Sequence, residues 1–386
     1  MKRLVSMVGR LMTNTADAEP YDAIVIGAGA AGVGVAIALK DAGLENFLVL
    51  DRHKVGASFD AWPAETRFIT PSFATNSIGM LDLNSIAIGV SPAFSLNVEH
   101  PTGREYAAHL RGVAKYFELP VRDNTDVRNI IKARDDFHIE IADETLSAKH
   151  VVWAAGEFQY PRLRGFVGSE LCRHTATIPS YKKLEGDDFI VIGGYESGID
   201  AAYHLAARDK HVRLFDKGCP WKETTADPSI ALSTYSLQRS RASFFKENVE
   251  MSPDVTVNAV THADGLHEVT LSDGRRFETE TPPILAGGFE GSHRMVEDLF
   301  ERRDDGFPLL SDTDESTVAP GLFLCGPAVR HGRHVFCFIY KYRQRFAVVA
   351  KAIANSLGLP AEKLEHYRQW GMYLDDLSCC GEECVC

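Results

Sequence analysis

A turn containing three glycines follows the first strand-like segment of the chain and constrains its fold more than any other feature. Residues 21–26 are mostly apolar, and Gly27, Gly29 and Gly32 then form a complete G-x-G-x-x-G. A helix of small residues is predicted next, and a second apolar strand ends at Asp51. Such a βαβ unit binds a diphosphate at the helix N-terminus, while the acid accepts hydrogen bonds from a ribose. The spacing therefore predicts dinucleotide binding at this turn.

The same pattern occurs a second time near the middle of the chain. An apolar strand is predicted over 188–192 and is followed by Gly193, Gly194 and Gly198, but Tyr195 stands where the middle glycine of the motif belongs. A side chain there hinders close approach of the backbone to a diphosphate, so a second nucleotide site and a decayed structural copy both remain open. The candidate residues of this second site are Gly193, Gly194, Glu196, Ser197, Gly198 and Asp216.

The acid that ends the second unit bears on the choice of nicotinamide nucleotide. Asp216 closes the second unit as Asp51 closes the first. Its carboxylate repels a 2′-phosphate and favours NADH, whereas the nearby cations Arg213 and Lys217 keep NADPH open.

Composition and charge narrow the class of protein further. The 386 residues are 45% hydrophobic and carry a formal net charge of −12, which is typical of a globular chain with an acidic surface. Such a surface repels nucleic acid and anionic membranes, and no apolar run approaches the 18 or more residues of a spanning helix. The sequence therefore predicts neither nucleic-acid binding nor membrane association.

The cysteines are distributed unevenly. Cys379, Cys380, Cys384 and Cys386 lie within the last eight residues, whereas the other four are scattered. A secreted fold held by disulfides spreads its cysteines along the chain, so we expect a reduced, cytoplasmic protein with a special tail. The apolar patch within residues 1–20 is too short for the core of a signal peptide.

The two units together resemble the flavoproteins with two dinucleotide-binding domains, which include thioredoxin reductase and the flavin-containing monooxygenases. The resemblance spans residues 21–370. It matches Gly56–Trp62 to the segment that approaches the flavin, Trp153–Gly156 to the crossover that closes the FAD domain, Gly321–Gly326 to the strand toward the ribityl chain, and Tyr342–Gln344 to the helix start beside the isoalloxazine. The resemblance implies FAD and NAD(P)H as cofactors.

The residues that the resemblance assigns to FAD come from several segments. One departure is Pro327, which stands where the family usually has an acid, so the ribityl contact is expected to be made differently. The implied FAD-binding residues are Gly27, Gly29, Gly32, Asp51, Arg52, Ser58, Trp62, Ala155, Gly156, Gly326 and Gln344.

The internal repeat and the resemblance together predict the domain organisation. The fold class is α/β, with two Rossmann-like ββα nucleotide-binding domains and the second inserted into the first. The expected order is a disordered leader at 1–20, the first part of an FAD-binding domain at 21–165, an NAD(P)H-binding domain at 166–288, the second part of the FAD domain at 289–374, and a cysteine-rich tail at 375–386.

The electron acceptor is the open question. No C-x-x-C lies between Gly193 and Gly288, and no C-x4-C accompanies the first glycine turn, so the tail holds the remaining candidates. It resembles the cysteine pair that ends mercuric reductase. Tail thiols can exchange with a disulfide or pass a soft metal, although neighbouring acids disfavour thiolates. We predict reduction of a small-molecule or protein disulfide, or of a thiol-bound metal, through Cys379, Cys380, Cys384 and Cys386.

Other interpretations remain open at this point. Residues 166–174 resemble a monooxygenase motif, but Cys172 occupies the place of its histidine, and His174 comes two residues late. Beside Arg173 and His174, Cys172 is either a thiol of lowered pKa or an inert buried cysteine. The alternatives are a flavin monooxygenase and a non-enzymatic flavin-bearing metal sensor or chaperone whose second site has decayed. For the tail alone, the alternative is a surface segment that only scavenges metal. Whether the protein forms a homodimer stays open.

Further local predictions concern the C-terminal part. Helices are expected over 340–356 and 361–374, and the alternation of Phe336 and Phe338 predicts a buried strand. Lys341, Arg343 and Arg345 form a basic cluster that either neutralises a reduced flavin or is the charged face of a helix.

Overall fold

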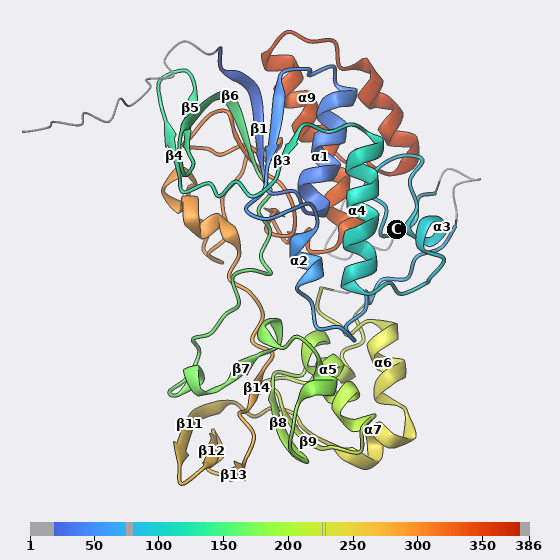
Figure 1. The fold of residues 1–386 in the computed structure, drawn as a ribbon, viewed down its shortest axis with the longest axis vertical. Helices are drawn as coiled ribbons and strands as arrows, with labels where there is room; N and C mark the ends of the chain where they lie inside the picture. The colour runs from blue at the N-terminus through green and yellow to red at the C-terminus, as the bar shows by residue number, and fades with distance from the viewer. Residues whose placement is uncertain (1–18, 75–79, 226, 228, 379–386) are drawn as a thin grey trace, which may run out of the picture.

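The computed structural model describes residues 19–74, 80–225, 227 and 229–378, which form two units joined by two crossing segments (Figure 1). The upper unit in Figure 1 contains both ends of the described chain, and the lower unit contains its middle. The predicted α/β fold with an inserted second unit is confirmed.

The first unit is built on a seven-stranded sheet. Its strands run in the order β3-β2-β1-β6-β5-β4, with β15 paired to β6. The strands β1, β2, β3, β6 and β15 are parallel, and β4 and β5 form an antiparallel meander on β6. Their bounds are β1 Tyr21–Ile26, β2 Phe47–Leu50, β3 Val121–Arg122, β4 Asn129–Lys132, β5 Phe137–Glu140, β6 Thr145–Trp153 and β15 Leu322–Leu324.

The insertion follows from the pairing of β6 with β15. These strands are adjacent in one sheet, with Val151 paired to Leu322, yet the whole second unit lies between them in the chain. One apolar core accordingly contains residues from both chain segments, including Val25 and Val349.

Helices cover the first sheet. The helix α1 follows the glycine turn and packs on α9, because Gly34 leaves no side chain where a Cβ would lie 2.0 Å from the Phe346 ring. The helix α4 begins at a capping box formed by Thr102 and Glu105. The bounds are α1 Ala30–Asp41, α2 Ala57–Asp60, α3 Pro92–Leu96, α4 Gly103–Tyr116, α8 Ile339–Tyr342 and α9 Phe346–Ser356, with a two-stranded ribbon of β16 Arg330–His331 and β17 His334–Val335.

The second unit repeats this plan on a smaller scale. A parallel five-stranded sheet runs in the order β10-β9-β8-β14-β7, and a separate antiparallel sheet contains β11, β12 and β13. The predicted hairpin at residues 272–274 joins β12 to β13. The bounds are β7 Arg173–His174, β8 Asp188–Ile192, α5 Glu196–Ala206, β9 His211–Phe215, α6 Thr234–Ser240, α7 Ser243–Asn248, β10 Val249–Ser252, β11 Val257–Ala263, β12 Leu266–Leu271, β13 Arg276–Thr279 and β14 Ile284–Leu285.

The C-terminal predictions need correction. The helix expected over 340–356 is interrupted by a 3₁₀ turn at Arg343–Arg345, where both arginine side chains are buried and bonded to other segments. The segment expected to be helical over 361–374 forms a 3₁₀ helix at Glu362–Trp370, which ends at Gly371 in a left-handed conformation. The strand predicted around Phe336 and Phe338 is wrong, since the ribbon ends at Val335.

Within the described ranges, no helix has both the length and the apolar character needed to cross a membrane.

Candidate functional site

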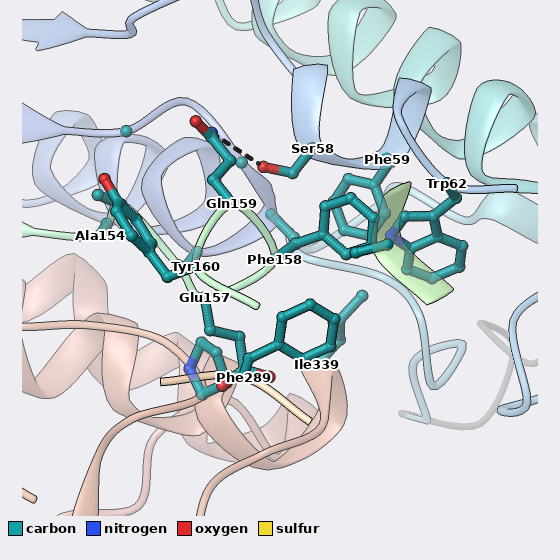
Figure 2. A pocket seen from close by; sticks show the side chains of 18 of the residues that line it. Ser58, Phe59, Trp62, Ala154, Glu157, Phe158, Gln159, Tyr160, Phe289 and Ile339 are labelled. Carbon is teal, nitrogen blue, oxygen red and sulfur yellow. Dashed lines mark hydrogen bonds between the residues drawn. The ribbon is translucent and has the colours of Figure 1, made fainter. Parts of the chain in front are cut away.

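A cavity of about 390 Å³ lies where the two units meet. It is lined at one side by the first glycine turn and the ends of β2 and β6, and at the other by the first turn of α5. Aromatic and aliphatic side chains close it from α2, from the segment after β6 and from α8 (Figure 2). The predicted cofactor residues that line it are Gly27, Gly29, Asp51, Arg52, Ser58, Trp62, Ala155, Gly156, Glu196 and Ser197.

The first glycine turn has the geometry that a diphosphate requires. Gly27 has φ +104°, and a Cβ there would lie 2.6 Å from the Ala154 carbonyl oxygen. A Cβ on Gly32 would lie 1.8 Å from the Gly27 carbonyl oxygen, so this glycine permits the tight contact between turn and helix. At Gly29, by contrast, a Cβ meets nothing within 4 Å, and this residue caps α1 beside the cavity. The open space at a helix N-terminus fits an anionic ligand.

Asp51 lies beside this turn, at the end of β2. Its Oδ2 accepts a hydrogen bond from the Ala28 amide at 2.7 Å, and its Oδ1 accepts one from the His53 amide at 2.8 Å. Burial raises the pKa of this carboxyl, and the two amide bonds oppose that shift. The carboxylate therefore fixes the turn and also faces the cavity.

Arg52 and Ser58 belong to a polar rim of the cavity. The Arg52 guanidinium donates to Asp126 at 2.7 Å and to the Tyr160 hydroxyl at 3.1 Å. The Gln159 amide donates to Ser58 Oγ at 3.4 Å, as the dashed line in Figure 2 shows. These bonds join the end of β2, α2 and the segment after β6 around one edge of the cavity.

The second glycine turn copies the first in its backbone. Gly193 has φ +103°, and a Cβ on Gly198 would lie 1.8 Å from the Gly193 carbonyl oxygen. Asp216 accepts from the Gly194 amide at 2.6 Å, as Asp51 accepts from Ala28. Tyr195 caps α5, and its hydroxyl donates to the Ala231 carbonyl at 3.0 Å. The tyrosine is thus accommodated in an intact turn.

A loop of the first unit is bonded to the second unit across the cavity. Thr66 donates to Asp200 Oδ2 at 2.6 Å, while Arg239 donates to Asp200 Oδ1 at 2.7 Å. Burial opposes ionisation of Asp200, but a hydrogen bond from His204 and the charge of Arg239 lower its pKa. Glu65 accepts from the Ser180 hydroxyl at 2.6 Å. The sequence carried no signal for these long-range contacts.

Cys337 is the one cysteine of the described residues that lines the cavity. Its Sγ lies 3.1 Å from Ser229 Oγ, and Lys341 donates to Ser229 at 2.8 Å and to Asp227 at 2.9 Å. Burial raises the pKa of this thiol, while the Ser229 bond and Lys341 lower it. Lys341, which belongs to the first unit, therefore binds Asp227 and Ser229 of the second unit.

Several predicted residues lie outside the cavity lining. The Gln344 side-chain amide donates a hydrogen bond to the Tyr340 carbonyl at 3.0 Å. Gly326 is absent from the lining, whereas the next residue, Pro327, is part of it. Gly32 and Gly198 also lie outside the lining, and each packs closely against the carbonyl of the first glycine of its own turn. The remaining predicted residues outside the lining are Gly193, Gly194 and Asp216.

Of the two interpretations of Cys172, the structure favours the inert thiol over the thiol of lowered pKa. Burial, assisted by the charge of Glu170, raises its pKa to about 12. The residue is half-buried and is absent from the cavity lining. The predicted catalytic cysteines Cys379, Cys380, Cys384 and Cys386 lie outside the described residues.

Sequence reasoning missed residues that directly follow a recognised motif. Glu157 and Phe158 come after Gly156 and line the cavity, and Phe289 lines it from the equivalent place after β14. Figure 2 shows these side chains together with Ile339 around the cavity. Their position after Trp153–Gly156 was the available signal.

The comparisons with known proteins agree with this geometry. An uncharacterised oxidoreductase CzcO of Bacillus subtilis is 28% identical over 193 residues, which are 48% of this chain and 52% of that protein. The chain thus spans about half the length of the first curated relatives it matches. Bacilliredoxin reductase Bdr of B. subtilis is 24% identical over 79% of this chain and 88% of that protein.

A solved structure shows the same fold. The bacillithiol disulfide reductase Bdr (YpdA) from Staphylococcus aureus superimposes with a TM-score of 0.72 at 18% identity, covering 88% of this chain and 99% of that one. The family model described as pyridine nucleotide-disulphide oxidoreductase matches residues 24–326. Because that match covers most of the chain, the protein belongs to the pyridine nucleotide-disulphide oxidoreductase family, whose members use FAD and NAD(P)H.

Proposed function

We propose that the chain is an FAD-dependent NAD(P)H oxidoreductase that reduces a disulfide. The observation that carries this proposal is the single cavity lined by Gly27 and Gly29 of the first turn and by Glu196 and Ser197 of α5. Nucleotides bound at the two helix N-termini would both extend into it. Bound FAD would supply the two-electron chemistry, while the protein binds, orients and shields the reactants.

The chain's own residues have separable roles in this proposal. The first turn and Asp51 hold the diphosphate and ribose of FAD, and the second turn with Asp216 holds the nicotinamide nucleotide. The aromatic side chains of Phe158 and Phe289 line the cavity. There they exclude water from the space between FAD and the nicotinamide nucleotide, because hydride transfer needs a contact without water.

A disulfide is the acceptor that the relatives favour. The B. subtilis relative is named as a bacilliredoxin reductase and the S. aureus structure as a bacillithiol disulfide reductase. The four cysteines in the described part of the chain are free thiols, which supports the cytoplasm as the proposed compartment. A soft metal as acceptor and a homodimer remain predictions.

The position of the last described residues supports a role for the tail. The Leu374 amide donates to the Gln344 carbonyl at 3.0 Å, and Arg345 donates to the Leu374 carbonyl. The tail therefore starts next to the turn that follows α8, and α8 contributes Ile339 and Tyr342 to the cavity. We propose that the tail cysteines carry electrons from the cavity to an external disulfide.

Truncation after Leu377 tests this role. We expect flavin reduction by NADH to stay within about twofold of the full chain, while disulfide turnover falls at least ~100-fold because the exchanging thiols are gone. Stopped-flow reduction and steady-state turnover with 2-hydroxyethyl disulfide measure the two steps. The fourfold variant Cys379→Ser, Cys380→Ser, Cys384→Ser and Cys386→Ser is the matched control that removes the same thiols without shortening the chain.

Three outcomes would redirect the proposal. Truncation-insensitive disulfide turnover would exclude the tail as the carrier. Oxygen consumption with an oxygenated product and no disulfide turnover would favour a monooxygenase. A bound flavin that neither NADH nor NADPH reduces would favour the non-enzymatic sensor.

The preferred nucleotide is proposed to be NADH. Arg213, one of the two cations that kept NADPH open, is paired with Asp188 and lies against the Phe277 ring, so it is committed elsewhere. The Asp216 carboxylate remains at the end of β9. A like charge near a 2′-phosphate costs about 1 kcal/mol or more, so we expect NADH to reduce the flavin at least about fivefold more efficiently than NADPH.

The variant Asp216→Asn checks this preference. It keeps an acceptor oxygen for the Gly194 amide but removes the charge, and we expect the NADH-to-NADPH ratio of kcat/KM to fall toward unity. Lys210→Gln, at an exposed pair with Asp187, serves as the charge-changing control. A wild-type preference for NADPH would contradict the assignment.

A further inference from the structure

Glu157 occupies a distinctive place in the cavity. The strands β1 and β6 are parallel, with Ile26 paired to Trp153, so the segment after β6 emerges beside the first glycine turn. Gly156 then adopts φ +68°, and Glu157 follows it as a cavity-lining residue. Figure 2 shows its side chain in the space bounded by Phe289 and Ile339.

The other carboxylates that line the cavity are engaged in bonds. Asp51 accepts from two backbone amides, and Asp126 pairs with Arg52. Glu196 accepts from the Ser233 amide and from two serine hydroxyls, and Asp200 is bonded to Thr66 and Arg239. Glu157 differs: among the described residues, no hydrogen bond or ion pair to its carboxylate is present, and only burial and the charges of Arg330 and Arg162 act on it.

The charged and titratable groups around Glu157 come from four elements. Arg330 lies in the ribbon, Arg162 in the segment after β6, Cys337 after the ribbon and Tyr342 in α8. The two cations are committed to other partners, since Arg330 donates to the Val329 carbonyl at 2.7 Å and Arg162 to the Phe289 carbonyl at 3.3 Å. They act on Glu157 through their charge alone.

The surroundings keep this carboxyl protonated to a higher pH than usual. Burial raises its pKa, and the charges of Arg330 and Arg162 oppose the shift without reversing it. The other protic groups of the cavity hold their protons too firmly. Burial raises the pKa of the Cys337 thiol from an already high value and that of Tyr342 well above its ordinary value. A donor works best when its pKa lies near the operating pH.

We propose that Glu157 is the proton donor for the disulfide that takes electrons directly in the cavity, in the step before the thiols so formed reduce the external acceptor. This inference rests on the proposed function and adds a residue to it. Reduction of one disulfide to two thiols consumes two electrons and two protons. NADH supplies both electrons and one proton as hydride, and Glu157 transfers the second proton to the departing thiolate sulfur. The S–S bond breaks and two S–H bonds form, one with the proton from Glu157 and one with the proton that NADH delivers as hydride. The Glu157 carboxylate then recovers a proton from water.

The test separates the two halves of the reaction. FAD-loaded Glu157→Gln is reduced chemically under anaerobic conditions, mixed with 2-hydroxyethyl disulfide, and its reoxidation is followed by stopped flow. We expect reoxidation to slow by about 10²- to 10³-fold, as for loss of a general acid. The wild-type rate should fall as pH rises through the raised pKa, and this limb should be missing in the variant. Glu157→Asp should restore part of the rate.

A second readout needs no bound cofactor. Because the folded chain holds this proton more tightly than the unfolded chain, its contribution to stability is lost as pH rises from the ordinary value of 4.5 through the raised pKa. The unfolding free energy of the FAD-free full chain should show this decline, and that of Glu157→Gln should lack it. Glu290→Gln, at an ion pair with Arg294, is the matched control for both readouts.

The outcomes are distinguishable from failure of the proposed function. Wild-type reoxidation rates in Glu157→Gln, or an unchanged pH limb, would overturn the role of Glu157. Failure of NADH and NADPH to reduce the flavin in the wild type would instead overturn the proposed function, while the chemically reduced protein still decides the role of Glu157.

Discussion

Replacing Asp314 by asparagine is expected to lower the free energy of unfolding by about 3–5 kcal/mol. Asp314 and Arg345 are both fully buried, and the carboxylate accepts from Arg345 at 2.8 and 2.9 Å and also from His331. Asparagine keeps the shape but removes the charge, which leaves a buried guanidinium without a charged partner. Urea unfolding monitored by tryptophan fluorescence measures the loss.

The Asp314→Asn change is also expected to affect the segment that leads to the tail, because Asp314 holds Arg345 in place. Arg345 also donates to the carbonyls of Asp312 and Leu374, so it holds the start of the tail against the turn that follows α8. Asp187→Asn is the matched control, because its pair with Lys210 is 2.7 Å long but Asp187 is 94% exposed. Such a pair contributes about 0–1 kcal/mol. An Asp314→Asn variant as stable as this control would contradict the assignment.

The second large effect concerns Gly29. We expect Gly29→Ala to weaken FAD binding by about 10- to 150-fold, since a methyl group in the open space would displace a diphosphate from one charge-assisted hydrogen bond, which contributes about 1.5–3 kcal/mol. The fold should tolerate the change, because Gly29 has φ −79° and ψ −167° and a Cβ there meets nothing within 4 Å. Fluorescence titration with FAD measures the affinity.

Two other glycine variants sharpen this prediction. Gly112→Ala adds the same methyl group to the exposed surface of α4 and should leave FAD affinity unchanged. Gly32→Ala places a Cβ 1.8 Å from the Gly27 carbonyl and should damage the fold as well as the site. Unchanged FAD affinity in Gly29→Ala would show that this turn does not hold the diphosphate.

The sequence predicted the parts of the molecule that local patterns encode. Within each unit, the first apolar strand, the glycine turn and the acid at the end of the second strand lie within about 30 residues of one another. The backbone of each unit therefore follows from its own segment of the sequence. Asp51 and Asp216 also accept equivalent hydrogen bonds, each from the backbone amide of the residue that follows the first glycine of its turn. The two-unit fold and the predicted superfamily are confirmed.

The destinations of individual side chains could not be predicted in this way. Lys341, Arg343 and Arg345 were expected to act together, yet they bind Asp227, the carbonyls of Asp82 and Ser85, and Asp314. Each partner is distant in sequence, and only tertiary packing brings it close. The place of Glu157 beside the cavity could have been predicted from its position after Trp153–Gly156, but its lack of a bonded partner could not, since that depends on how every other carboxylate around the cavity is engaged.

The most direct test of the central claim is anaerobic stopped-flow mixing of the native, never-denatured full chain with NADH, followed at the visible flavin band. If the two glycine turns deliver their nucleotides to one cavity, the protein is yellow and the band bleaches on mixing. A colourless protein that does not take up added FAD, or a bound flavin whose band persists with both NADH and NADPH, would contradict the account.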